Sequence, residues 1–183
     1  MPARHERKQF ISGGIYHIFD RGINKQEIFH SDDDFGYFEN SLTLYLTSPD
    51  QLLEALGHST NSLSQIQLKN LVQRSLFLKN YSEEINLHAY CFMPNHYHLL
   101  VQQSSERSIS LFMKSLQTRY AMYYGKKYGR IGPLFQGRYK GILVENEAYY
   151  ITVLEYIHQN PAELKFGTQN PDTYLWSSKR ART

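Results

Sequence analysis

Short apolar runs and longer runs of periodic apolar residues alternate along the chain, and they predict strands and helices in turn. Four short apolar segments bounded by turn residues predict strands at 15–20, 85–93, 96–102 and 139–144. A first helix is predicted over about 35–46, because three aspartates just before it favour a helix start. Apolar residues at three- and four-residue steps predict a helix over 108–124, and a last helix is predicted over 147–159.

These elements follow the order strand, helix, strand, strand, helix, strand, helix. The turn residues Pro94 and Asn95 predict a hairpin between the second and third strands, whereas helices connect the others. This mixture predicts an α+β fold, a ferredoxin-like (RRM-like) antiparallel sheet with helices packed on it. Residues 50–82 are rich in Leu, Ser, Gln and Asn, and we interpret them as a helical insertion. We expect one domain over residues 1–183, with a basic N-terminal arm at 1–12.

Composition narrows the class of protein. No segment reaches the ~18–20 apolar residues that cross a bilayer, and no apolar region follows the basic N-terminus, so we expect neither membrane insertion nor a secretory signal. Cys91 is the only cysteine, which excludes internal disulfides and a Cys-rich zinc site. A cytoplasmic location is the default expectation for such a chain.

The net charge of +3 is modest, but its distribution is uneven. Residues 107–140 contain no Asp or Glu, and they carry five tyrosines beside their cations. The predicted DNA-binding cations are Arg107, Lys114, Arg119, Lys126, Lys127, Arg130, Arg138 and Lys140. Cations neutralise phosphates and aromatic rings stack on unpaired bases, so the segment indicates nucleic-acid binding. The alternative is a solvated basic surface over core tyrosines.

The pair His96 and His98 is the sharpest local feature. Side chains two apart on a strand point to the same face, so both imidazoles would present themselves to one metal ion. Tyr97 would then pack on the opposite face. The alternative is a pair of exposed or hydrogen-bonded histidines. A third ligand must come from elsewhere, and His88 is one candidate, although we favour a structural role for it.

Tyr156 and Asn160 lie four residues apart on the last predicted helix, so they share one face. The carboxamide oxygen of Asn160 could complete a metal site, which would place Tyr156 close to the metal. The spacing alone favours the alternative, in which Tyr156 packs half-buried and Asn160 caps the helix. His158 would point nearly opposite to Tyr156, and we favour a structural role for it as well.

Several blocks of this sequence resemble the single-tyrosine (HUH-type) transposases, in particular the branch associated with repetitive extragenic palindromes. The blocks are Gly14-Ile15-Tyr16-His17-Ile18 with Asp20-Arg21-Gly22, Met93-Pro94-Asn95-His96-Tyr97-His98-Leu99-Leu100, Gly137-Arg138-Tyr139-Lys140 and Tyr156-Ile157-His158-Gln159-Asn160-Pro161. They keep the family's order from about Gly13 to Leu164, nearly the whole chain.

The resemblance implies a ferredoxin-like fold, a substrate of single-stranded or hairpin DNA, and a requirement for Mg²⁺ or Mn²⁺. It implies metal binding by His96, His98 and Asn160, and nucleophilic attack by Tyr156 to form a 5′-phosphotyrosine. Both monomers and homodimers occur among such proteins. We therefore expect a metal-dependent single-stranded DNA endonuclease and strand transferase. The alternatives are a non-catalytic hairpin-DNA-binding protein and a metal-dependent phosphodiesterase that uses water as its nucleophile. Of the three functions, only the first requires Tyr156 to attack DNA.

Overall fold

The structure, a computed structural model, describes residues 10–58, 62–164 and 170–179. Its elements are β1 (Ile15–Arg21), η1 (Ile23–Lys25), α1 (Asp32–Leu46), α2 (Pro49–His58), α3 (Ser62–Ser75), β2 (Ile85–Met93), β3 (His96–Gln103), α4 (Ser108–Tyr128), β4 (Lys140–Leu143), α5 (Glu147–Gln159) and η2 (Asn160–Glu163). The predicted order of strands and helices is confirmed. Residues 1–9, which include Arg4, Arg7 and Lys8 of the expected N-terminal arm, lie outside the described residues.

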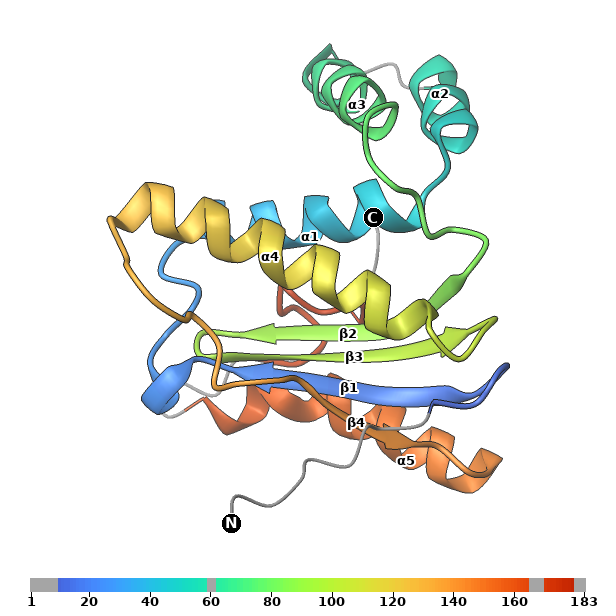
Figure 1. The fold of residues 1–183 in the computed structure, drawn as a ribbon, viewed down its shortest axis with the longest axis vertical. Coiled ribbons are helices and arrows are strands. Elements are labelled where there is room, and N and C mark those ends of the chain that lie inside the picture. Colours follow the sequence, from blue (N-terminus) through green and yellow to red (C-terminus); the bar gives the residue numbers. More distant parts are fainter. Residues whose placement is uncertain (1–9, 59–61, 165–169, 180–183) are drawn as a thin grey trace.

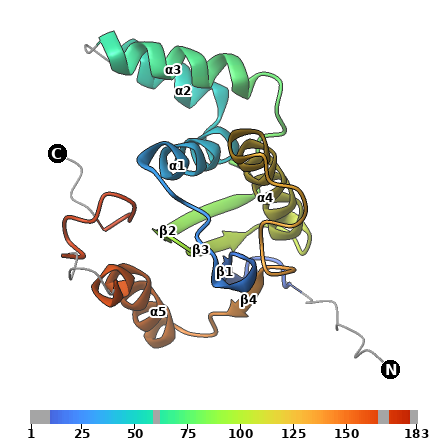
Figure 2. The ribbon, with the colours of Figure 1, turned by 90° about the vertical axis from the view of Figure 1, so that its left-hand side faces the viewer.

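The four strands form one sheet in the order β2-β3-β1-β4, and every neighbouring pair is antiparallel. Helices α1 and α4 cover one face of the sheet, and α5 covers the other (Figures 1 and 2). The predicted α+β fold is therefore confirmed. No helix in the part of the chain that the structure describes is long and apolar enough to cross a bilayer.

Side chains alternate across β3 and separate two hydrophobic clusters. Tyr97, Leu99 and Val101 are fully buried on the side of α1 and α4. Leu100 lies in the second cluster, on the side of α5, together with Val153 and Ile157. The alternation that buries one set of residues therefore turns His96 and His98 toward α5.

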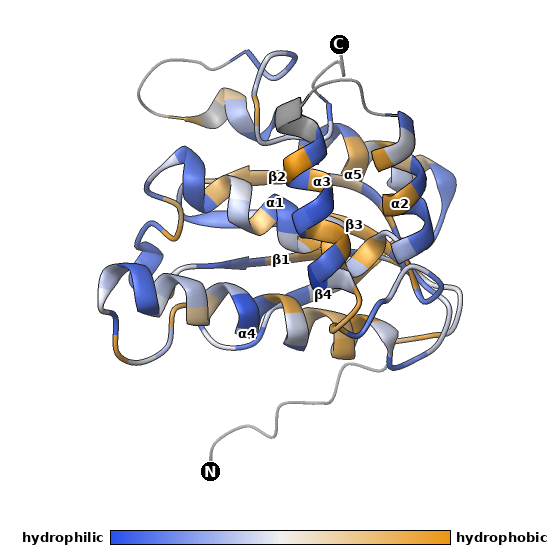
Figure 3. Ribbon diagram, turned by 90° about the horizontal axis from the view of Figure 1, so that it is seen from above, coloured by the Kyte–Doolittle hydropathy of each residue, from blue (hydrophilic) through white to orange (hydrophobic). Residues whose placement is uncertain are grey.

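Helix α4 extends one turn beyond its predicted end and stops at Gly129, which takes a left-handed conformation with φ of 64°. The added turn is held by buried Asp34 at the start of α1. Asp34 accepts hydrogen bonds from Lys127 Nζ at 2.7 Å and from the Tyr128 hydroxyl at 2.7 Å. Figure 3 shows hydrophilic and hydrophobic positions alternating along α4.

Residues 50–82 supply the expected helical insertion. They include α3 and all of α2 but its first residue, and these two helices pack against each other beyond the α1–α4 layer (Figure 1). Helix α3 contacts α1, and the chain returns to β2 through Tyr81, whose side chain is buried in the main core. The insertion thus lies on the side of the sheet away from α5.

Candidate active site

Two neighbouring strands place three imidazoles on the face of the sheet that α5 covers. His96 and His98 come from β3, and their rings are 5.0 Å apart. His17 comes from β1, which pairs with β3 so that Phe19 lies opposite His98. The Nε2 atom of His17 lies 2.8 Å from Nδ1 of His98, at hydrogen-bond distance. His17 was not among the predicted site residues.

The turn after β1 orients His96. A Cβ at Gly22 would collide with the carbonyl oxygen of Gln26, so the tight turn there requires glycine. Asn95 Nδ2 donates to the carbonyl oxygen of Lys25 at 3.2 Å, which leaves Asn95 Oδ1 to accept from His96 Nδ1 at 2.6 Å. With its proton on Nδ1, His96 carries its lone pair on Nε2.

Helix α5 brings Tyr156 and Asn160 to these imidazoles. It starts at Asn146, whose side-chain oxygen accepts from the backbone N–H of Tyr149 at 2.9 Å. The Tyr156 ring lies 5.5 Å from the His98 ring, edge to face, and is 46% exposed. The nucleophile candidate therefore stands beside the histidine pair while its side chain stays accessible to a substrate.

The Asn160 side chain is buried, and its orientation follows from its hydrogen bonds. Its Nδ2 donates to the carbonyl oxygen of Tyr156 at 2.8 Å, so its Oδ1 must point the other way. That oxygen lies 3.4 Å from His96 Nε2. An oxygen and a nitrogen lone pair thus face each other, an arrangement that suits a shared cation.

Burial keeps His17 and His98 neutral. It lowers the pKa of His98 well below its ordinary value, and the nearby His96 and His17 lower it further. Burial also lowers the pKa of His17 to about 4. Neutral imidazoles retain the lone pair that a metal ligand needs.

A basic hollow of about 420 Å³ opens over this group. Tyr156, His96 and His98 line it together with four cations, which are Arg21, Lys25, Arg138 and Lys140. Asp20 is the acidic member of the lining, and burial raises the pKa of its carboxyl group, although hydrogen bonds from Arg21 and Gln117 oppose the rise. The surplus of positive charge suits a phosphate group.

The donor atoms present fit a divalent cation held by two imidazoles and one amide oxygen. Within the described ranges, no group of three or more His, Cys, Asp or Glu side chains converges as a metal site. His17 is directed at His98 Nδ1, so it supports a ligand rather than adding one. Imidazole combined with oxygen ligands accommodates several divalent metals, Mn²⁺ among them.

A family model described as "Transposase IS200 like" matches residues 61–160. The chain belongs to the IS200-like transposase family. No curated protein gives a significant match.

Two solved structures resemble this IS200-like transposase. A REP-associated tyrosine transposase bound to a REP hairpin superposes with a TM-score of 0.52 at 13% identity, covering 95% of this chain and 81% of that one. A candidate transposase from Deinococcus radiodurans R1 gives a TM-score of 0.44 at 15% identity, covering 87% of this chain and 96% of that one. At such identities the first match establishes a shared fold.

The cations predicted to bind DNA divide between different parts of this transposase. Arg138 and Lys140 line the basic hollow, where Lys140 Nζ lies 5.8 Å from the Phe19 ring centre. Arg107, Lys114, Arg119, Lys126, Lys127 and Arg130 are not among the residues that line it. Lys127 pairs with buried Asp34, and Arg130 donates to the carbonyl oxygen of Pro133 at 2.9 Å.

The two other histidines considered as ligands, His88 and His158, lie outside the candidate metal site. His88 Nδ1 lies 3.0 Å from the Tyr150 hydroxyl, and His158 Nε2 lies 2.9 Å from the Ser178 hydroxyl. Both therefore have local hydrogen-bond partners, in agreement with the structural roles that we favoured.

The sequence interpretation missed His17 and the cations Arg21 and Lys25. A signal existed, because His17 and Phe19 are two apart on a predicted strand and so share a face. What the pattern lacked was the pairing of β1 with β3, which decides that this face carries His98.

Proposed function

We propose that this transposase is a metal-dependent single-stranded DNA endonuclease and strand transferase that uses Tyr156 as its nucleophile. The observation that carries the proposal is the convergence of Tyr156 with the imidazoles of His96 and His98 at one basic hollow, where Asn160 Oδ1 lies 3.4 Å from His96 Nε2. This geometry places a potential nucleophile, a candidate cation site and phosphate-binding charges next to one another.

In the proposed step, the phenolic oxygen of Tyr156 attacks the phosphorus of a phosphodiester. The new bond joins that oxygen to the 5′ phosphate, and the bond from phosphorus to the 3′ oxygen breaks. The phenol loses its proton and the departing 3′ oxygen gains one, which leaves a free 3′-OH. The phosphotyrosine bond retains the energy of the phosphodiester, so a 3′-OH can attack it and rejoin a strand.

We assign Mg²⁺ or Mn²⁺ to His96, His98 and Asn160. Such an ion, when bound, polarises the scissile phosphate and offsets negative charge in the transition state. Arg138 and Lys140 hold the flanking phosphates. His17 is a positioning residue, because its hydrogen bond to His98 Nδ1 fixes the ring so that Nε2 remains for the cation.

For the substrate we propose a DNA hairpin flanked by single strand. The solved structure that shares this fold was bound to a REP hairpin, and residues 107–140 of this chain contain eight cations and no Asp or Glu. Single-stranded flanks bring a phosphate to Tyr156 without the need to open a duplex. Backbone contacts of this kind make binding dependent on salt.

The test uses hairpin DNA labelled at one end or the other. With Mn²⁺, a label on the 3′ side of the cut should stay with the protein after denaturation, whereas a label at the 5′ end should be released. Tyr156→Phe should abolish the adduct and leave DNA binding nearly unchanged. Tyr149→Phe is the matched control, because Tyr149 is an exposed tyrosine of the same helix.

Two results would contradict the proposal. Cleavage that persists in Tyr156→Phe, with no DNA attached to protein, would assign the reaction to water. Binding without cleavage or adduct in the wild-type chain, with either metal, would leave a non-catalytic DNA-binding protein.

A further inference from the structure

A groove on the outer surface of the α1–α4 layer is left unexplained by the site at Tyr156. We propose that it binds a second segment of single-stranded nucleic acid, at a distance from the scissile phosphate. The choice of nucleic acid rests on the proposed function. The residues that define this outer groove are Tyr37 of α1 and Lys114, Arg119, Met122, Tyr123 and Lys126 of α4.

The groove combines flat rings with an exposed apolar side chain. It encloses about 790 Å³, within the range of about 300–1,000 Å³ for ligand sites. Tyr37 and Tyr123 stack with ring centres 3.9 Å apart and planes within 10°. Met122 is 71% exposed beside them, a large exposure for an apolar side chain. Met122 and the partly exposed tyrosine rings form a surface against which an unpaired base can pack.

The positive charges of the groove come from Lys114, Arg119 and Lys126. Among the described residues, no carboxylate lies within ion-pair distance of Lys114, Arg119 or Lys126, and none lines the groove. The Arg119 guanidinium carbon lies 5.7 Å from the centre of the Tyr37 ring and 6.0 Å from that of Tyr45, so aromatic faces hold it. Its Nε is buried without a hydrogen-bond partner in the part of the chain described.

The cations follow α4 over a length that matches several nucleotides. Lys114 and Lys126 are twelve residues apart, which is about 18 Å of helix, the length of roughly five stacked nucleotides. The favourable charge stops at the neighbouring hollow, which Asp32 and Asp33 line and where Asp33 lies 3.9 Å from Lys127 Nζ. The groove therefore has one end at which an anionic chain is no longer attracted.

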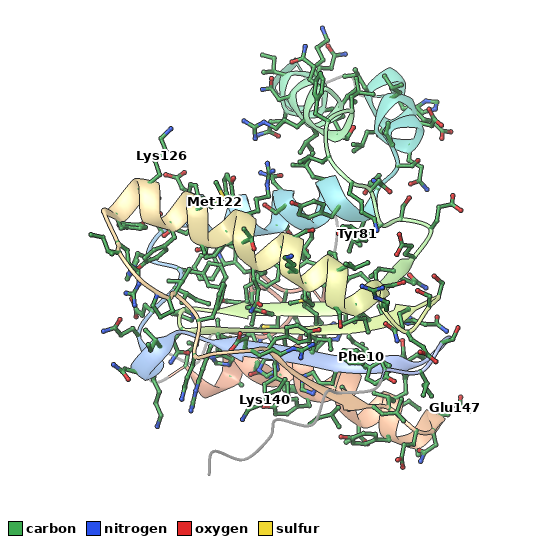
Figure 4. The ribbon with its side chains drawn as sticks, in the orientation of Figure 1. Phe10, Tyr81, Met122, Lys126, Lys140 and Glu147 are labelled. Carbon is green, nitrogen blue, oxygen red and sulfur yellow. The ribbon has the colours of Figure 1, made fainter. Side chains whose placement is uncertain are left out.

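The outer groove lies on the opposite side of the sheet from Tyr156. In Figure 4, Lys126 and Met122 extend from α4 away from the strands, whereas Lys140 lies at β4 on the side of α5. A DNA molecule bound at both places must pass around the edge of the sheet. Charge alone would also suit an acidic peptide, but the stacked tyrosines beside the cations favour bases and phosphates together.

The experiment measures binding of a fluorescein-labelled single-stranded oligothymidine to the full chain in EDTA, over a series of salt concentrations. EDTA removes metal-dependent contacts and cleavage. Removing two phosphate contacts with Lys114→Gln/Lys126→Gln should raise Kd about tenfold at about 0.15 M salt and reduce the salt slope by about 1.4. The matched control is Lys69→Gln/Arg74→Gln, which removes two exposed cations of α3 outside the groove.

Cross-linking locates the bound strand. With 5-iodouracil in the oligonucleotide, irradiation should attach it to Tyr37 or Tyr123. An unchanged Kd and salt slope in the groove variant, an equal loss in the control, or cross-links confined to α5 would overturn the inference. So would a polyglutamate peptide that binds the wild-type chain more tightly than the oligonucleotide does, because the groove would then suit an acidic protein.

Failure of this inference is distinguishable from failure of the proposed function. The Mn²⁺-dependent adduct at Tyr156 is measured in parallel on hairpin DNA. An adduct that forms normally while the groove variant binds like wild type refutes only the outer groove. A groove effect without any adduct in the wild-type chain refutes only the nuclease mechanism.

Discussion

Replacing His17 tests whether the buried hydrogen bond behind His98 sets the affinity for metal. His17→Phe keeps an aromatic ring of similar size between β1 and α5 but removes the nitrogen that lies 2.8 Å from His98 Nδ1. His98 is 5% exposed, so no bulk water replaces the lost partner. An unsatisfied buried N–H costs about 1–3 kcal/mol, which the His98 ring avoids by turning away from its ligand geometry.

At about 1.4 kcal/mol for each factor of ten, that cost corresponds to a loss in metal affinity of about 5- to 150-fold. This includes the range of about 10–100-fold that is usual for a residue that supports a ligand. The assay is calorimetric titration of Mn²⁺ into the full chain without DNA, so it does not depend on catalysis. His17→Gln retains an acceptor and should recover most of the affinity.

His88→Phe is the matched control. It removes another partly buried imidazole with a single tyrosine partner, away from the candidate metal ligands. Thermal denaturation of each variant establishes that it is folded. Wild-type Mn²⁺ affinity in a folded His17→Phe chain, or an equal loss in His88→Phe, would refute the positioning role.

Three further predictions concern other parts of the molecule. Asn160→Ala should weaken Mn²⁺ binding, whereas Asn160→Asp should preserve it. Calorimetric titration measures both affinities, and an equal loss in the two variants would contradict the ligand role of Asn160. Arg138→Gln and Lys140→Gln should each raise Kd for DNA and lower the salt slope by about 0.7, as measured by fluorescence anisotropy; an unchanged slope would remove that residue from the phosphate contacts. Burial raises the pKa of Asp34, but hydrogen bonds from Lys127 and Tyr128 outweigh it and hold the pKa at about 2. Because the folded-state pKa lies below the unfolded value, Asp34 should add about 2 kcal/mol to the free energy of unfolding above about pH 4. This stabilisation should be lost as the pH falls through about 2. Denaturant unfolding should show this loss in the wild-type chain and not in Asp34→Asn.

The sequence by itself determined the elements and the faces on which their side chains lie. A strand repeats every two residues, so His96 and His98 had to share a face opposite Tyr97. A helix repeats every 3.6 residues, so Tyr156 and Asn160 had to share another. These relations hold between residues that are close along the chain, and backbone geometry alone decides them.

Only the tertiary structure decided which faces meet. His17 lies 81 residues from His98, and their contact depends on the order β2-β3-β1-β4 and on the register of β1 against β3. The same packing divided the basic segment, because α4 covers one face of the sheet whereas β4 is an edge strand of the sheet itself, and it paired Lys127 with Asp34. Burial across the whole sheet selects such long-range pairings, and the local pattern of hydrophobic positions does not specify them.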